Sequence, residues 1–553
     1  MANYIPGLDY TEWEALGIPV VGSSSALHIS NGSWMCEDRR NNDYANPEVY
    51  YSQAAGASGN VRVFNTKLCS WMEITSSLSN TVGAFGAGVA CEFIPSLSPS
   101  GTLAAGNTTT RVVLSTALPA AVVANQIANR GDGKGWYVRI TGKSAGGSGK
   151  TEERRVIANT SGTTPTLELE SALSFTPAAG DGYEFLSGSY VIMLTGSVSA
   201  GVFKRFDRLT GAVSSLGVAG SCPNLAATGN NFVVFDPSYV PNNRKSGEGQ
   251  VVGAGTYNGG LFGCLTATAS AAGTITGEAS AGDFGFPANT FRNYAIRIVE
   301  DTGTPTAVGQ IRRITSHTGG GVTPVYTLAS NWTVTPSATA KFVIEHYGDN
   351  LMLLPGGATT TYNYVISTAT WDTTTWAASP SSVRTTGAFS VLCHGVVPNT
   401  LGTYKSGIVV AIRGNSAFFD YLDISAAATG SWSSLNPVDN STAVLDCWAS
   451  TSDCVYMAYN PHTQDGKFLY FLPGATSQTT ISAKNFGRLD VTNFKISKFA
   501  GPKMVGGSAT PATSKSAFVM LCYNGTEKVV SYVTPRPSVA SSAPDYWRCL
   551  LNF

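Results

Sequence analysis

The sequence predicts an all-β protein: a β-propeller of about six blades that carries two small antiparallel β-domains as insertions. Three observations lead to this fold class. The composition is poor in charge and rich in turn residues, a unit of about 50–65 residues recurs along the chain, and a longer pattern occurs twice.

The composition is typical of a chain with many short strands and tight turns. Of the 553 residues, 13% are charged and 60 are glycine, whereas an ordinary domain has about 25% charged residues. Hydrophobic residues make up 43%, which is enough to bury large cores and argues against a disordered chain. The net charge of zero argues against a surface built as a whole to bind nucleic acid or anionic lipid.

The shorter repeat consists of an apolar strand, a turn with glycine, a strand with an aromatic residue, and a further turn followed by Trp. Its clearest copy is residues 351–376. One such four-stranded sheet cannot cover both of its faces, so we expect radial stacking on two neighbours to bury them. Such units are expected near residues 61–71, 203–216, 362–376, 418–432, 485–499 and 528–547.

The longer repeat relates residues 136–186 to residues 294–345. Both copies show short alternating runs separated by Gly, Thr and Pro, as half-buried antiparallel strands require. The matched pairs are Pro165 with Pro324, Leu169 with Leu328, Leu173 with Trp332 and Pro177 with Pro336.

The two kinds of repeat define the expected domain organisation. Each inserted domain is expected between the first and second, or the second and third, strands of its blade. Residues 18–36 are expected to supply the strand that closes the ring with the last blade. The expected order is propeller over residues 1–95, inserted domain over 96–187, propeller over 188–264, inserted domain over 265–347, and propeller over 348–553.

Residues 351–376 resemble the kelch motif, with the doublet Gly356 and Gly357 followed by Tyr362, Tyr364 and Trp376. The inserted pattern is similar to a β-module that is common in the structural proteins of tailed bacteriophages. A propeller with such insertions resembles the tail nozzle or tail-tube proteins of short-tailed phages.

That resemblance implies a virion protein without catalysis or cofactor. It implies a ring of copies, usually six in such families, that contacts neighbouring tail, adaptor and fibre proteins and lets phage DNA pass. It also implies synthesis in the host cytoplasm and a final location in the virion tail.

Two local motifs resemble catalytic signatures, and both are interpreted as parts of a hairpin loop. Ser144 to Thr151 resembles a P-loop, but Ser144 stands where the first Gly is required, and a strand is expected where the motif needs a helix. Gly142 to Gly146 matches a G-x-S-x-G nucleophile elbow, again without a following helix.

The remaining candidates for chemistry lack the spacing of a known site, so no catalytic, cofactor-binding or metal-binding residue is assigned. None of the ten cysteines forms a C-x-x-C pair, and we expect buried free thiols. No histidine pair has metal-ligand spacing. The histidines are His28, His317, His346, His394 and His462.

Four basic pairs recur along the chain. For these we expect structural salt bridges, with contact to another subunit or to passing DNA as the alternative. The pairs are Arg39–Arg40, Arg154–Arg155, Lys204–Arg205 and Arg312–Arg313.

The chain start has neither a basic nor an apolar signal region, and no window reaches about 18 apolar residues, so neither export nor a membrane span is expected. The function expected from the sequence is that of a structural tail nozzle component, not an enzyme. The alternatives are a receptor-binding or decoration protein of the virion, and a carbohydrate-active or oxidase propeller. The last alternative requires acids, or His with Tyr, that converge at one end of the ring.

Overall fold

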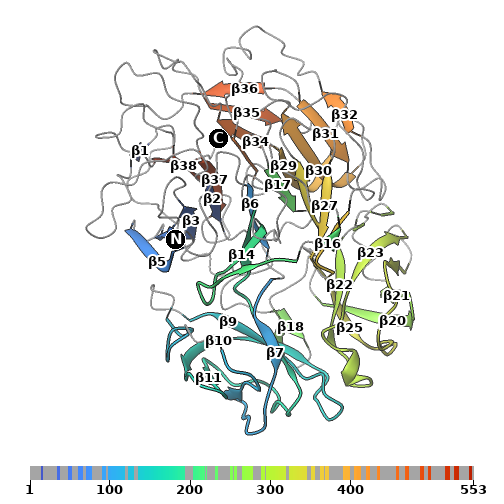
Figure 1. Ribbon diagram of the computed structural model, residues 1–553. Coiled ribbons are helices and arrows are strands. Elements are labelled where there is room, and N and C mark those ends of the chain that lie inside the picture. Colours follow the sequence, from blue (N-terminus) through green and yellow to red (C-terminus); the bar gives the residue numbers. More distant parts are fainter. Residues whose placement is uncertain are drawn as a thin grey trace, which may run out of the picture.

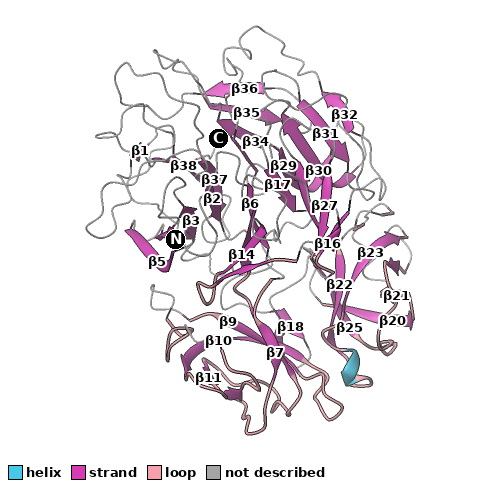
Figure 2. Ribbon diagram, in the orientation of Figure 1, coloured by secondary structure: helices cyan, strands magenta, loops and turns pink. Residues whose placement is uncertain are grey.

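The computed structural model confirms the all-β class, and almost every regular element is an antiparallel strand (Figure 2). The structure describes residues 97–118, 122–129, 135–193, 203–217, 264–277, 294–318 and 323–345 as continuous segments. It also describes residues 288–289, 291–292, 361–366 and 368–372, and the strands named below.

Six sheets share one plan, in which the strands follow one another in sequence from one edge to the other. The first four sheets, in chain order, are as follows. The first has β2 (Trp34–Glu37), β3 (Glu48–Ser52), β4 (Asn60–Asn65) and β5 (Ser70–Ser77). The second has β6 (Ala90–Ile94), β13 (Ser189–Met193), β14 (Phe203–Asp207) and β15 (Val213–Ser215). The third has β17 (Asn231–Val234), β26 (Asn350–Leu354), β27 (Tyr362–Val365) and β28 (Thr370–Asp372). The fourth has β29 (Ser390–Pro398), β30 (Tyr404–Ile412), β31 (Phe419–Asp423) and β32 (Trp432–Leu435).

The last two sheets complete the set. The fifth has β33 (Tyr456–Tyr459), β34 (Phe468–Leu472), β35 (Phe486–Asp490) and β36 (Ile496–Phe499). The sixth has β37 (Ala517–Cys522), β38 (Val529–Thr534), β39 (Trp547–Leu550) and, at its outer edge, β1 (Glu14–Ala15).

The first strands of these sheets contact one another in a closed cycle. The contacts run from β2 to β6, then to β17, β29, β33 and β37, and from β37 back to β2. Sheets that are joined in a circle through their first strands form a β-propeller.

Packing between neighbouring sheets follows from the alternation of side chains along a strand. On β26, Leu351 and Leu353 pack toward the second sheet, against Phe203. Met352 and Leu354 pack on the other side, in a core shared with Val409 of the fourth sheet. Because both faces of the sheet are covered, β26 is apolar at consecutive positions instead of alternating.

The structure corrects three details of the expected propeller. The closing strand is β1, which pairs with β39 through Glu14 and Arg548, and is not part of residues 18–36. β2, at Trp34–Glu37, instead begins the first sheet. The third sheet has an additional edge strand, β16 (Ala219–Gly220), parallel to β28.

The aromatic residue between the second and third sheets also differs from the expected one. Trp371 packs there, with its ring 5.2 Å from that of Phe203 and 5.1 Å from that of Tyr364. Trp376, which the sequence pattern assigned to this place, lies outside the described residues.

Two further six-stranded sheets stand beside the ring (Figure 1). We call the first module 1. Its strands are β7 (Ser100–Thr102), β8 (Arg111–Val113), β9 (Tyr137–Thr141), β10 (Thr151–Asn159), β11 (Thr166–Leu169) and β12 (Gly182–Phe185). We call the second module 2. Its strands are β20 (Leu265–Ala271), β21 (Thr274–Gly277), β22 (Ala295–Glu300), β23 (Ile311–His317), β24 (Val325–Leu328) and β25 (Lys341–Glu345).

The two modules have the same strand order. Module 2 is a closed barrel in the order β20-β21-β24-β23-β22-β25. Module 1 has the corresponding order β7-β12-β9-β10-β11-β8, and a single bridge between Leu103 and Leu114 joins its two edges. Each module encloses its own apolar core.

Candidate functional site

Both modules leave the ring from the connection between a first and a second strand. Module 1 lies between β6 and β13 in the sequence, and module 2 between β17 and β26. Because β6 and β17 contact each other in the ring, the two insertions leave adjacent sheets. The structure thereby selects one of the two insertion points that the sequence left open.

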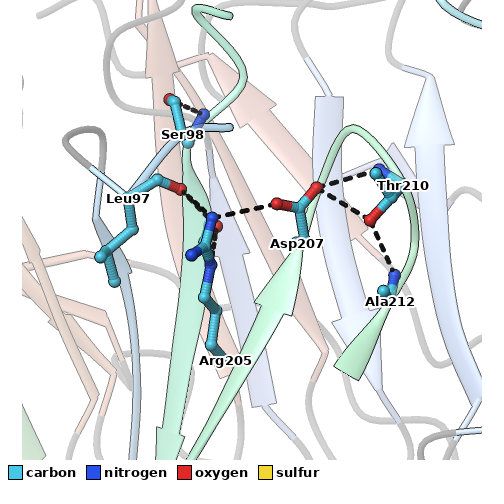
Figure 3. A network of polar contacts seen from close by, with 8 residues as sticks. Leu97, Ser98, Arg205, Asp207, Thr210 and Ala212 are labelled. Carbon is cyan, nitrogen blue, oxygen red and sulfur yellow. Dashed lines mark hydrogen bonds and ion pairs between the residues drawn. The ribbon is translucent and has the colours of Figure 1, made fainter. Parts of the chain in front are cut away.

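A polar network fastens module 1 to its blade (Figure 3). The Arg205 guanidinium on β14 donates through Nη2 to the Leu97 carbonyl and to Asp207 Oδ2, both at 3.0 Å. Its Nε donates to Ser189 Oγ at 2.9 Å, and that hydroxyl donates in turn to Leu97. Ser98 Oγ accepts the Gly188 amide. The segments that enter and leave module 1 are therefore joined to each other and to the third strand of the blade.

Asp207 also closes the turn that follows β14. Its Oδ1 accepts the Thr210 amide and hydroxyl, each at 3.0 Å, and Gly211 completes the turn at a φ of 68°. An aspartate that binds its own backbone in this way is a common turn device. The arrangement is structural, and no group in it is left free for chemistry.

Replacing Asp207 with alanine is expected to lower the stability of this blade by about 1–2 kcal/mol, because the change removes a turn acceptor and a charged partner of Arg205. Asp207→Asn is the matched control. It keeps the turn acceptor, so it should cause less than half of that loss. Thermal unfolding of the two variants measures the difference. Equal losses in the two variants would mean that the stability comes from the negative charge of Asp207, which both variants lack, and not from the turn acceptor.

The hairpin interpretation of the P-loop-like motif agrees with the observed geometry. Residues 142–150 connect β9 to β10, and no helix follows. Asp181 Oδ1 accepts the Ser144 amide at 2.8 Å, so a carboxylate occupies the side of the loop where a phosphate would bind. Among the described residues, the buried Ser144 hydroxyl has no hydrogen-bond partner, so no histidine is placed to activate it.

The basic pairs in the described region make contacts within the chain. Arg154 binds Glu152 at 2.6 Å and the Ala172 carbonyl at 2.8 Å. Arg312, at the equivalent place in module 2, binds the Asn331 carbonyl at 2.8 Å. Arg155 contacts Glu170 and the Tyr137 ring, Arg205 contacts Asp207, and Lys204 donates to Ser215. Arg39 and Arg40 lie outside the described residues.

His317 is the one histidine whose side chain the structure describes, and it is part of the module 2 core. Its Nε2 accepts the Phe291 amide at 2.8 Å, and its Nδ1 lies 2.7 Å from the Thr318 carbonyl. Burial lowers the pKa of His317, Arg292 lowers it further, and the contact with Thr318 opposes them. His394 is a residue of β29, whereas His28, His346 and His462 lie outside the described residues.

The lowered pKa predicts that module 2 loses stability in acid. The unfolded state takes up a proton below about pH 6.5, whereas folded His317 stays neutral until a lower pH. Stability should fall by about 1.4 kcal/mol per pH unit in that interval, while no such loss occurs above it. The change in unfolding free energy between pH 7 and pH 5.5 measures the effect. The same slope in His317→Gln would assign it to another group.

In the part of the chain that the structure describes, no three His, Cys, Asp or Glu side chains gather as metal ligands would. Cys91 and Cys264 are free thiols. None of the described helical segments has the length and apolar character needed to cross a membrane.

Comparison with known proteins gives structural neighbours only. No family model matches the sequence, and no curated protein matches it. An α-L-arabinanase of Penicillium chrysogenum, solved in complex with arabinobiose, aligns over 99% of both chains with 8% identity and a TM-score of 0.29. A GH74 enzyme of Niastella koreensis aligns over 99% of this chain and 67% of its own, with 10% identity and a TM-score of 0.18.

These neighbours contradict the prediction of a non-catalytic tail nozzle protein, because both are named as enzymes. That prediction is therefore wrong and is not carried further. The ring of copies, the tail partners and the virion location were implied by it and remain untested. With TM-scores below 0.5, neither neighbour provides an argument for a particular activity of this chain.

Proposed function

We propose that the chain is a carbohydrate-active propeller of six blades, and that its site lies at the end of the ring where the first strands finish. The observation that carries the proposal is the closed cycle of first strands. Sheets related by rotation about one axis keep the same strand direction, so the carboxyl ends of all first strands lie at one end of the ring. We call this the carboxyl end of the ring.

Acidic residues follow two of these strands in the sequence. Glu37 is the last residue of β2, and Asp236 stands two positions after the end of β17. Both strands contact β6. We propose that Glu37 and Asp236 are the pair of acids that a carbohydrate-active propeller requires at one end of the ring.

Glycoside hydrolysis uses such a pair of carboxyl groups. One protonates the oxygen of the leaving sugar, and the other activates water or attacks the sugar directly. The zero net charge of the chain suits an uncharged polymer better than a polyanion. Both modules are inserted after a first strand. Module 1 follows β6 directly, whereas module 2 follows β17 after the paired strands β18 (Gln250–Val252) and β19 (Gly255–Tyr257). They are therefore in a position to limit which part of a polymer reaches the pair.

The full chain should be tested for hydrolysis of a panel of neutral plant and microbial polysaccharides, with mass spectrometry of the products. We expect activity that Glu37→Gln and Asp236→Asn each reduce by at least about 100-fold. The control is Glu168→Gln, a module 1 residue whose substitution should leave activity unchanged. Absence of hydrolysis across the panel would refute the proposed enzymatic activity. Binding of a polysaccharide without hydrolysis would indicate a carbohydrate-binding protein.

A further inference from the structure

In both modules, the last residue of one strand holds the segment that precedes another strand. In module 1, Asn159 ends β10 and holds residues 125–127, which precede β9. The Asn159 carbonyl accepts the Asn125 amide at 2.8 Å, and Asn125 Oδ1 accepts the Asn159 amide at 3.3 Å. The side chain of Asn159 accepts the Ile127 amide through Oδ1 at 2.9 Å and donates through Nδ2 to the Thr160 carbonyl. We call these four hydrogen bonds the clamp of module 1.

Module 2 has a clamp with the same four contacts, but a histidine takes the place of the asparagine that ends β10. His317 ends β23, its carbonyl accepts the Asn289 amide at 3.1 Å, and Asn289 Oδ1 accepts the His317 amide at 3.0 Å. His317 Nε2 accepts the Phe291 amide at 2.8 Å, and Nδ1 lies 2.7 Å from the Thr318 carbonyl. The backbones correspond as well, because φ is 62° at Asn125 and 66° at Asn289.

The two acceptors differ in their response to acid. An amide oxygen keeps its lone pairs, whereas a protonated imidazole has two donors and no acceptor. Because Nδ1 faces a carbonyl oxygen, neutral His317 holds its proton there and presents the Nε2 lone pair to the Phe291 amide. Protonation of Nε2 therefore places one donor against another. The bond to Phe291 is buried, so the loss of its acceptor is costly.

The groups around His317 keep the ring neutral while the clamp is closed. The ring stacks on that of Phe291 at 5.1 Å and lies 5.6 Å from that of Tyr326 on β24. Burial raises the pKa of Tyr326 above its usual range, so this hydroxyl stays neutral. Burial lowers the pKa of His317, the Thr318 contact opposes this, and the positive charge of Arg292 lowers the pKa further. When the segment leaves, the ring reaches water and regains an ordinary pKa of about 6.5.

We propose that the clamp of module 2 is a proton-operated switch, which holds residues 289–292 while His317 is neutral and releases them when His317 is protonated. The clamp of module 1 stays closed at both pH values. Release takes the Phe291 ring out of the core of module 2. The released fraction should rise by up to about tenfold for each pH unit below about 6.5, until the ring of the closed clamp is itself protonated. The switch does not depend on the activity proposed above.

Hydrogen exchange of the full chain tests the switch without any substitution. Protection factors, corrected for the intrinsic pH dependence of exchange, are compared at pH 7.5 and pH 5.5. We expect the Phe291 amide to lose about tenfold in protection at pH 5.5. The Ile127 amide, its counterpart in module 1, should keep its protection. The Ile314 amide, bonded to the Tyr294 carbonyl inside module 2, should stay at least about tenfold better protected than Phe291 at both pH values.

Two outcomes in the parent chain would overturn the inference. Equal protection of Phe291 and Ile314 would mean that module 2 opens only as a whole. An Ile127 amide that loses as much protection as Phe291 would mean that the histidine is not the cause.

Exchange of the two residues between the clamps provides matched variants. His317→Asn gives module 2 the acceptor of module 1 and should make the protection of Phe291 equal at both pH values. Asn159→His is the converse change, and it should make the Ile127 amide lose about tenfold in protection at pH 5.5. A folded His317→Asn variant in which Phe291 keeps its pH dependence would refute the switch. If that variant does not fold, the comparison of Phe291 with Ile127 in the parent chain decides.

Discussion

Replacement of Arg139 with methionine should lower the unfolding free energy of module 1 by about 3–5 kcal/mol. The guanidinium is 2% exposed and binds Glu153 through Nε and Nη2 and Glu184 through Nη1. Methionine fills a similar volume but leaves Glu153, which is itself buried, without this positive partner. The loss therefore comes mainly from the carboxylates that remain, and only to a small degree from packing.

Urea unfolding followed by hydrogen exchange of β9 amides measures this loss for module 1 separately from the other cores. Arg111→Met is the matched control, because Arg111 is exposed, and it should change stability by less than about 0.5 kcal/mol. A loss below about 1 kcal/mol for Arg139→Met would mean that water reaches both glutamates.

Replacement of Gly135 with alanine should cost about 3 kcal/mol, because a Cβ at this position would overlap the Val156 carbonyl oxygen. The obstacle is backbone and cannot rotate away as a side chain could. The neighbouring hydrogen bonds, from the Val156 amide to Trp136 and from the Trp136 amide to Ile127, hold both segments in place. Accommodation of the methyl group therefore requires a shift of β10 itself.

Gly146→Ala serves as the control for Gly135→Ala. A Cβ on Gly146 meets no atom within 4 Å, so its effect should stay within about 0.5 kcal/mol. The thermal midpoint of module 1, followed through the buried Trp136, gives the comparison. Similar midpoints for the two variants would show that β10 shifts at little energetic cost.

Much of the strand content could be anticipated because its signals are local. The apolar run at Leu351 to Leu354 and the aromatic strand at Tyr362 to Val365 both appear as strands of the third sheet. Local signals are weaker where the last strand of a sheet comes from a distant part of the chain. The closing strand has two residues, Glu14 and Ala15, and it is defined by its pairing with β39, at the other end of the chain.

The arginine pairs show that the partners of side chains, like those of strands, are hard to predict when they lie far along the chain. Their recurrence at Arg154 and Arg312 was visible in the repeat, and an internal role was expected. Arg154 forms the expected salt bridge with Glu152, but both guanidinium groups also bind a carbonyl oxygen, of Ala172 and of Asn331. Every residue has a backbone carbonyl group, so the sequence does not indicate which carbonyl oxygen will accept a hydrogen bond from each arginine.

The chain's residue pattern alone establishes the all-β class and the internal duplication, because strand alternation and turn residues act over a few positions. The order of strands around the ring, the adjacency of the two insertions and the encounter of Arg139 with Arg297 at Glu184 depend on contacts between distant segments. Those contacts arise only when segments far apart in the sequence pack together, and the spacing of these residues along the chain does not indicate which of them will meet.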